Sequence, residues 1–164
     1  MEITSEKIQS KIVELSQNIS EFYLENNEFK YLSIVVPLSG GVPFAVDLVK
    51  SLSDEIQNKL LMCYAYDMEE EWYFSDSNPE TGEPILIIED IYDTGKTLAD
   101  IIPWLEEKFT PREIKTVVLL DKEIEKVNNI TIDWTGFIVE DTWVFGYGMD
   151  DENGMRRGLP YITD

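Results

Sequence analysis

The chain contains no histidine, and this absence excludes several kinds of chemistry at once. Imidazole acid–base catalysis, Ser-His-Asp and Cys-His nucleophilic sites and nearly every zinc site depend on that side chain. Any proton transfer must therefore use a carboxylate, a lysine or a tyrosine. Cysteine is almost absent as well. Cys63 stands alone in LLMCYAY, so no intrachain disulfide is possible, and we expect a buried thiol in a cytoplasmic protein.

Basic residues and long apolar runs are also scarce. The 164 residues include 13 Lys and Arg against 33 Asp and Glu, which gives a formal net charge of −20. A field of this sign repels nucleic-acid phosphates and anionic membranes, so we predict neither as a partner. No apolar run approaches roughly 18 residues, and the N-terminus is charged from residue 2. We therefore expect neither a membrane-spanning helix nor a signal peptide.

The remaining composition is typical of one folded domain with alternating strands and helices. Apolar residues make up 43% of the chain, which is too rich for a disordered acidic protein. Periodicity predicts helices over 5–25, 44–57 after Pro43, and 97–109, where Pro103 marks a kink or an early stop. Strands are predicted at 31–37, 60–66, 85–90, 115–121, 135–139 and 143–147, with a long loop or small hairpin at 67–84. This order predicts a parallel sheet with helices on both faces and a ligand at the carboxyl ends of its strands.

The stretch ILIIEDIYDTGKTL, residues 85–98, joins a buried strand to a group of polar side chains. Its four apolar residues predict a strand buried on both faces, and Glu89, Asp90 and Asp93 follow at the carboxyl end. A P-loop would need a glycine five residues before the Gly-Lys pair, but Asp90 stands there. The stretch is therefore not a nucleoside-triphosphate loop.

Its chemistry suits a smaller phosphate ligand. A turn of backbone N–H groups that opens a helix, here with two hydroxyls and a lysine, can bind a phosphate monoester. The carboxylates before the turn can accept hydrogen bonds from the vicinal hydroxyls of a sugar. We interpret the stretch as a cradle for a ribose 5-phosphate. The alternative is a capped helix after a core strand, with its acids at the surface.

EDIYDTGKTL resembles the phosphoribosyl-pyrophosphate (PRPP) signature of the type I phosphoribosyltransferases: two acids, Asp-Thr-Gly and a closing Thr. Other segments are similar, in order and spacing, to the hypoxanthine and hypoxanthine-guanine members: EKIQSKIVELSQNISEFY, VVPLSGGVPFAVDLVKSL, VLLDKEIEKV, and GFIVEDTWVFGYGMD followed by LPYI. The resemblance covers nearly the whole chain. It implies an α/β parallel-sheet fold in one domain, 1–164, with a core at about 28–125 and a small hood built from the N-terminal segment and about 130–164.

The resemblance also implies roles for the acids. Glu89 and Asp90 would hold the ribose hydroxyls, and Asp93 would be the catalytic acid–base group at the purine N7. Asp93 could instead be only a helix N-cap. The 5-phosphate would lie on Asp93, Thr94, Gly95, Lys96 and Thr97.

A second group of residues matches the purine subsite of the family. Lys122 would contact the 6-oxo group, Trp143 would stack on the base, and Val144 would read its edge through backbone groups. Lys122 could instead be a solvated surface cation, and Trp143 could simply pack in the core.

The leaving group has its own matches. The pyrophosphate loop corresponds to Leu38, Ser39, Gly40 and Gly41, a turn that often carries a cis non-proline peptide in the family. Asp150 matches a carboxylate that helps to place Mg²⁺ on the pyrophosphate. One arginine also matches, but one residue is inserted here: counting from Asp150 selects Arg156, our first choice, and counting back from LPYI selects Arg157.

The loop at 67–84 departs from the family. The family has a long mobile segment that begins with a Ser-Tyr pair and closes over the site. Here the segment is shorter, lacks Ser-Tyr and contains no basic residue, so Tyr66 or Tyr64 would have to replace the missing tyrosine.

The function that the resemblance implies is purine salvage. The enzyme would join a 6-oxopurine, hypoxanthine or guanine, to PRPP with Mg²⁺, and would form a homodimer or homotetramer. One alternative is a non-catalytic regulator of the same fold that senses PRPP. Another is the same transfer to xanthine or a pyrimidine.

Overall fold

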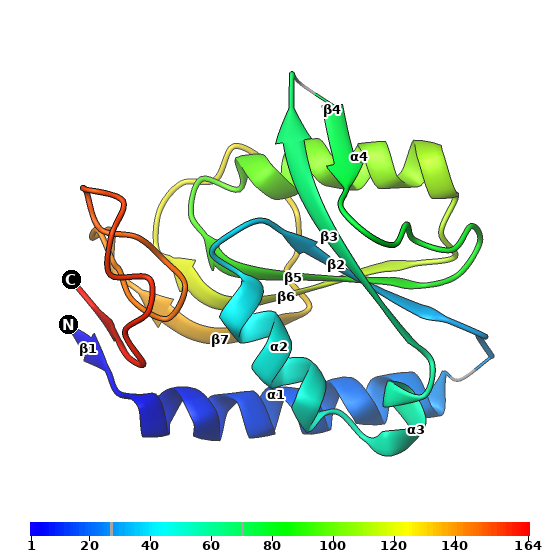
Figure 1. The fold of residues 1–164 in the computed structure, drawn as a ribbon, viewed down its shortest axis with the longest axis horizontal. Helices are drawn as coiled ribbons and strands as arrows, with labels where there is room; N and C mark the ends of the chain where they lie inside the picture. The colour runs from blue at the N-terminus through cyan, green and yellow to red at the C-terminus, as the bar shows by residue number, and fades with distance from the viewer. Residues whose placement is uncertain (27, 70) are drawn as a thin grey trace.

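A six-stranded sheet forms the centre of the computed structural model, which describes residues 1–26, 28–69 and 71–164. Its spatial order is β4-β3-β2-β5-β6-β7, and every neighbouring pair is parallel except β3 with β4 (Figure 1). The strands span Leu32–Pro37 (β2), Leu60–Met68 (β3), Glu71–Phe74 (β4), Ile85–Tyr92 (β5), Ile114–Lys122 (β6) and Trp134–Val139 (β7).

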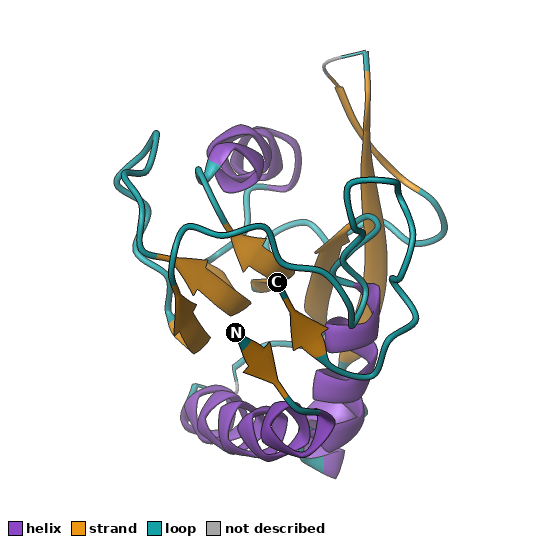
Figure 2. Ribbon diagram, turned by 90° about the vertical axis from the view of Figure 1, so that its left-hand side faces the viewer, coloured by secondary structure: helices purple, strands orange, loops and turns teal. Residues whose placement is uncertain are grey.

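Helices cover both faces of this sheet, as predicted (Figure 2). One face carries α1 (Ser5–Glu25), α2 (Val42–Ser51) and α3 (Asp54–Gln57), and the other carries α4 (Lys96–Phe109). Successive strand residues point to opposite faces. Along β2, Ile34 and Val36 join the core on the α1 side, whereas Val35 joins the core under α4. None of the described helices is both long and apolar enough to cross a membrane.

One predicted helix was wrong as a single element, and another is confirmed over 97–109 without the early stop considered at Pro103. The helix predicted over 44–57 is divided, because Leu52 has extended backbone after α2 and Ser53 precedes α3. Pro103 does not end α4, which continues to Phe109. A proline in a helix removes one N–H donor but still permits the helix where surrounding packing holds it; Leu98, Ile101 and Leu105 anchor α4 in the core.

The segment at 67–84 combines both predicted forms. Its first part is a hairpin, in which β4 pairs antiparallel with the end of β3, and residues 75–84 form a loop. The predicted strand at 143–147 was wrong, since only isolated bridges form there, from Phe145 to Thr163 and from Gly146 to Met149. Gly146, Tyr147 and Gly148 have φ values of 96°, 49° and 104°, which a β-strand does not tolerate.

The chain ends meet in a small sheet that the sequence did not predict. Strand β1 (Glu2–Ile3) pairs antiparallel with β8 (Ile162–Thr163), and the two termini lie side by side (Figure 1). The same end of the molecule carries the segment that follows β7. This segment packs back onto the main core through Val144, Tyr147 and Met149.

The packing of α1 predicts opposite effects for two neighbouring residues. Ile12 is fully buried and Val13 is 49% exposed. Ile12→Ala should lower the free energy of unfolding by about 2–5 kcal/mol because it leaves a cavity, whereas Val13→Ala should change it by less than about 0.5 kcal/mol. Urea denaturation of both variants measures this difference. Equal losses would show that α1 does not bury this face.

Candidate active site

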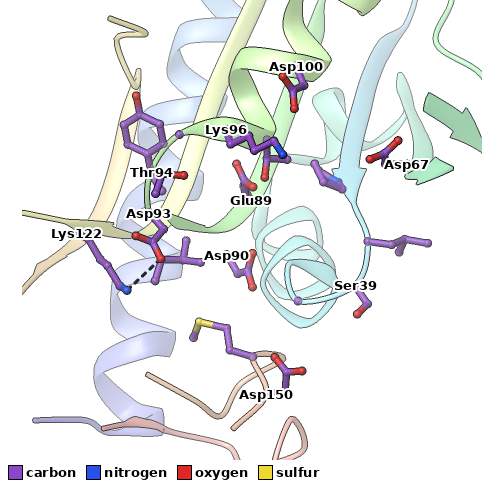
Figure 3. A pocket seen from close by; sticks show the side chains of 18 of the residues that line it. Ser39, Asp67, Glu89, Asp90, Asp93, Thr94, Lys96, Asp100, Lys122 and Asp150 are labelled. Carbon is purple, nitrogen blue, oxygen red and sulfur yellow. Dashed lines mark hydrogen bonds and ion pairs between the residues drawn. The ribbon is translucent and has the colours of Figure 1, made fainter. Parts of the chain in front are cut away.

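A cavity of about 690 Å³ opens at the carboxyl edge of the sheet, above β2, β5 and β6 (Figure 3). It lies where parallel-sheet proteins bind ligands, as predicted. Nearly all the predicted site residues line it. The lining residues are Pro37, Leu38, Ser39, Gly40, Tyr66, Asp67, Trp72, Glu89, Asp90, Ile91, Tyr92, Asp93, Thr94, Gly95, Lys96, Thr97, Asp100, Lys122, Trp143, Val144, Met149, Asp150 and Arg157.

Two carboxylates lie deep in this cavity at the end of β5. Burial and the neighbouring Asp90 charge raise the pKa of Glu89 from 4.5 to about 8, against a hydrogen bond with Thr97 that lowers it. Burial also raises the pKa of Asp90, whose opposing influences include its own backbone N–H and Arg157. Gly40 lies close to Asp90: a Cβ there would meet the Asp90 Oδ2 atom at 1.9 Å. Any larger residue at this point would displace the Asp90 carboxylate.

The predicted phosphate cradle is a turn from β5 into α4. Gly95 has a φ of 83°, in the left-handed region, and α4 begins at Lys96. Thr94 and Lys96 have exposed side chains at the cavity wall. Helix N-termini present free N–H groups and a positive dipole end, so this turn can accept an anion.

Lys122 and Asp93 form an ion pair at the neighbouring strand ends. The Lys122 Nζ lies 3.0 Å from the Asp93 Oδ2 and 3.7 Å from the Asp141 Oδ1. The Lys122 side chain is only 8% exposed, so it is not a solvated surface cation. Figure 3 shows the Asp93 and Lys122 side chains meeting inside the cavity. The two residues that the sequence assigns to the base are therefore in contact.

The segment after β7 forms the opposite wall. Trp143 is 58% exposed and does not pack in the core, so its ring can meet a ligand. Its indole N–H donates to the Asp150 carbonyl at 3.2 Å. The Asp150 carboxylate pairs with the Arg157 guanidinium at 2.7 Å, and Arg157 also donates to the Gly148 carbonyl at 2.7 Å.

Two predicted site residues do not line the cavity. Arg156, the first choice from the sequence, lies outside it, paired with Asp151 at 3.4 Å and placed over the Phe145 ring. Its φ of 67° directs the chain through a turn, so that the next residue, Arg157, reaches the cavity. Gly41 is buried just behind the wall, where it precedes α2. The Leu38–Ser39 peptide is cis, as expected for this loop.

The hairpin of β3 and β4 contributes further residues to the cavity, of which the sequence analysis considered only Tyr66. Tyr66 and Asp67 from β3 and Trp72 from β4 line the cavity, together with Asp100 from α4. Of the two tyrosines considered, Tyr66 lines the cavity, whereas Tyr64 packs against the main core. The only sequence signal was the cluster of aromatic residues in an otherwise acidic segment.

The cavity is strongly acidic. Among the described residues that line it are six carboxylates, namely Asp67, Glu89, Asp90, Asp93, Asp100 and Asp150, against three cations, Lys96, Lys122 and Arg157. A polyanionic ligand would enter this cavity only with cations of its own. Within the described parts of the chain, no group of three metal-binding side chains could hold an ion by itself.

The comparison with known proteins first defines a class. The phosphoribosyl transferase domain family matches residues 4–152, so the chain belongs to this family, and its sheet and helices form the type I phosphoribosyltransferase fold.

Particular relatives narrow the class further. The chain is 32% identical over 161 residues to the hypoxanthine-guanine-xanthine phosphoribosyltransferase of Tritrichomonas foetus, covering 94% of this chain and 85% of that one. It is 34% identical over 166 residues to the hypoxanthine-guanine phosphoribosyltransferase of Bacillus subtilis (strain 168), covering 98% and 89%. The Trypanosoma cruzi hypoxanthine phosphoribosyltransferase in complex with the product IMP aligns with a TM-score of 0.84 at 26% identity, covering 97% and 85%.

The raised pKa of Glu89 predicts how stability depends on pH. A buried carboxyl with a folded pKa near 8 and an ordinary value of 4.5 binds its proton more tightly when folded. It therefore lowers stability as the pH rises between these values. Glu89→Gln removes this penalty. The melting temperature of the variant should therefore exceed that of the wild type by several degrees at pH 9 and by little at pH 5. For a chain of this length, roughly 2–4 °C in melting temperature corresponds to 1 kcal/mol. Thermal melts across this range measure the difference, and a gap independent of pH would contradict the shift.

Proposed function

We propose that this protein is a purine-salvage phosphoribosyltransferase that converts PRPP and hypoxanthine or guanine to IMP or GMP and pyrophosphate. The observation that carries this proposal is the contact between Asp93 and Lys122 at 3.0 Å. It presents a hydrogen-bond acceptor and a donor side by side, next to the exposed ring of Trp143. The names of the relatives above support the same substrates.

This pair is complementary to one edge of a 6-oxopurine. The N7 atom and the 6-oxygen lie next to each other on that edge. Asp93 can accept a proton from N7 while the Lys122 ammonium donates to the 6-oxygen. Adenine carries an amino group at position 6 instead, which would face the ammonium with donor against donor. The pair therefore favours oxo over amino purines.

The rest of the cavity suits PRPP. We assign the ribose hydroxyls to Glu89 and Asp90, the 5-phosphate to residues 93–97, and the pyrophosphate to residues 38–41 with Arg157. The buried carboxylates accept hydrogen bonds from hydroxyls, and the N–H groups at the start of α4 bind phosphate. All of these residues except Gly41, which lies just behind the wall, line one cavity.

Magnesium fits the charge balance of the site. Asp150, Glu89 and Asp90 offer hard oxygen ligands in the cavity, but no described cluster could bind the ion alone, so substrate oxygens must complete its shell. Bound there, Mg²⁺ would neutralise charge on the leaving pyrophosphate. Asp150 would be its nearest protein ligand.

In the reaction, a purine ring nitrogen forms a bond to C1 of the ribose while the bond from C1 to the pyrophosphate oxygen breaks. Positive charge grows on the ribose at that moment. We assign the ribose to the neighbourhood of Glu89 and Asp90, whose side-chain oxygens can stabilise that charge. While one ring nitrogen attacks C1, the base loses the proton on its N7 atom, and Asp93 accepts that proton. Lys122 holds the 6-oxygen, and Trp143 fixes the ring plane.

The alternative of a non-catalytic PRPP sensor has no specific observation in its favour, since Asp93 and Lys122, the residues that we assign to catalysis and to the base, both line the cavity. Transfer to xanthine or a pyrimidine is an outcome of the assay below. A homodimer or homotetramer and a cytoplasmic location stay predictions.

The single cysteine, Cys63, is buried, as expected from the sequence. Burial raises the pKa of its thiol to about 12, so this thiol is unreactive.

An assay of free bases tests the proposal. Hypoxanthine, guanine, xanthine, adenine and uracil are each incubated with PRPP and millimolar Mg²⁺, and nucleotide formation is followed by absorbance. We expect turnover with hypoxanthine or guanine and none with adenine. If only uracil reacted, or if none of the five bases reacted, the assignment would be overturned.

The acid–base role of Asp93 predicts a loss of rate without a loss of binding. Asp93→Asn should retain the fold and the affinity for PRPP but lower kcat by about 100-fold or more, which is the usual contribution of a positioned proton acceptor. Steady-state kinetics and calorimetry measure the two quantities. Unchanged kcat would remove Asp93 from the mechanism.

The acidic cavity predicts that binding itself needs metal. Calorimetric titration with PRPP should show weak or no binding in EDTA and strong binding in millimolar Mg²⁺, because the three cations of the cavity cannot offset both its ionised carboxylates and the polyanionic ligand. Equal affinity in both conditions would contradict the proposed role of the metal.

The second carboxylate near Lys122 predicts a preference between bases. Asp141 adds a negative charge 3.7 Å from the ammonium that would hold the 6-oxygen. Xanthine, a weak acid that is partly anionic near neutral pH, should be disfavoured relative to hypoxanthine. Asp141→Asn should raise the ratio of kcat/KM for xanthine to that for hypoxanthine several-fold. The change should be modest because Asp141 is 70% exposed. An unchanged ratio would show that this charge does not select the base.

A further inference from the structure

Four consecutive carbonyl groups of the phosphate turn are bound by one short segment, residues 126–128, which we call the brace. Lys126 Nζ donates to the carbonyls of Tyr92 and Asp93, at 2.8 and 2.9 Å. The Val127 N–H donates to the Thr94 carbonyl at 2.9 Å, and the Asn128 side chain donates to the Gly95 carbonyl at 2.7 Å. The brace thus follows the turn residue by residue.

Lys126 also binds the neighbouring strand end. Its ammonium donates to the Lys122 carbonyl at 2.6 Å and pairs with the Asp121 carboxylate at 2.9 Å. It lies over the Tyr92 ring, 4.4 Å from the centroid. Its three N–H donors match the three carbonyls. One largely buried charge, 16% exposed, therefore joins the two backbone points that carry Asp93 and Lys122.

Asn128 holds the turn from the other side. Besides its bond to Gly95, its side-chain oxygen accepts from the Tyr92 hydroxyl at 2.8 Å and from the Ile130 N–H at 2.9 Å. A Cβ at Gly95 would meet the Asn128 Nδ2 atom at 2.5 Å, so the two residues are in close contact. The brace itself lies behind the turn, because none of residues 126–128 lines the cavity.

We propose that Lys126 is a positioning residue, which fixes Asp93 against Lys122, and that the brace as a whole turns the carbonyls of residues 92–95 away from a bound phosphate. Carbonyl oxygens repel phosphate, whereas N–H groups attract it, so the direction of these peptides decides whether the turn binds an anion. This inference rests on the proposed function for its effect on catalysis. The geometric part stands without it.

Nothing in the sequence singled out this residue. Lys126 lies in EIEKVNN, an acidic segment between strands, where a lysine is typically a solvated surface cation. Only the folded chain brings its ammonium under the ends of β5 and β6.

The test compares Lys126→Met with a matched control, Lys115→Met. Lys115 lies at the other end of β6, outside the cavity, and also has a carboxylate partner, Asp133 at 2.9 Å, and an aromatic neighbour, Phe22, with the ring centroid at 5.2 Å. Both variants lose an ion pair and a ring contact. Only Lys126→Met should lower kcat, by about 10–100-fold, because small misplacements of catalytic groups cost that much. Equal kcat losses in the two variants would overturn the proposal.

Two further variants distinguish positioning from general destabilisation. Lys126→Arg retains the charge and the N–H donors, so it should recover most of the lost rate. In an Asp93→Asn background, Lys126→Met should cost much less than in the wild type, because it acts through Asp93. If the kcat losses of Asp93→Asn and Lys126→Met simply multiplied in the double variant, or if Lys126→Arg recovered no rate, a positioning role would be contradicted.

A readout without substrate separates this inference from the proposed function. Amide hydrogen exchange at residues 93–97 should be about 10-fold faster in Lys126→Met than in the wild type or Lys115→Met. If the wild type transfers no phosphoribosyl group but this exchange pattern holds, the proposed function fails and the brace stands. Unchanged exchange overturns the brace even where the enzyme is active.

Asn128→Ala provides a second variant should Lys126→Met fail to fold. It releases the Gly95 carbonyl and the Tyr92 hydroxyl but leaves the charge of Lys126 in place. We expect a several-fold rise in the KM for PRPP with a smaller change in kcat. An unaltered KM would show that the brace does not shape the phosphate turn.

Discussion

The pairing register between β5 and β6 is the constraint on which the site depends. These strands are parallel, with Tyr92 opposite Asp121. One residue further on, Asp93 and Lys122 leave the two strands side by side, and their side chains meet at 3.0 Å. A slip of one residue would turn each side chain to the other face of the sheet. The buried apolar residues of both strands prevent such a slip, so the hydrophobic core fixes the distance between the two polar groups.

The same edge of the sheet concentrates negative charge at a cost in stability. Glu89 is buried with a raised pKa, and Asp90 beside it adds to the repulsion. An unliganded protein gains nothing from this arrangement. It becomes favourable when ribose hydroxyls and metal-bound phosphates supply the missing donors and positive charge. The acidity of the cavity and the proposed need for Mg²⁺ therefore have one cause.

Sequence patterns predicted the parts of this structure that depend on local order. Apolar runs located the sheet, and the residues after β5 identified the turn that lines the cavity. Counting left two candidates for the arginine at the wall, Arg156 and Arg157, and favoured the wrong one, because the choice depends on a left-handed residue within a turn. Asp67 and Trp72 were missed because the antiparallel pairing of β3 with β4 brings these two opposite residues to the cavity from separate positions in the chain. The role of Lys126 was hidden for the same reason, since its partners come from two distant strand ends.

A crystal structure with IMP bound tests the central claim most directly. The account predicts the phosphate on residues 93–97, the ribose hydroxyls on Glu89 and Asp90, and the base over Trp143, with N7 at Asp93 and the 6-oxygen at Lys122. A phosphate bound elsewhere, or a base that leaves the Asp93 and Lys122 pair untouched, would contradict it.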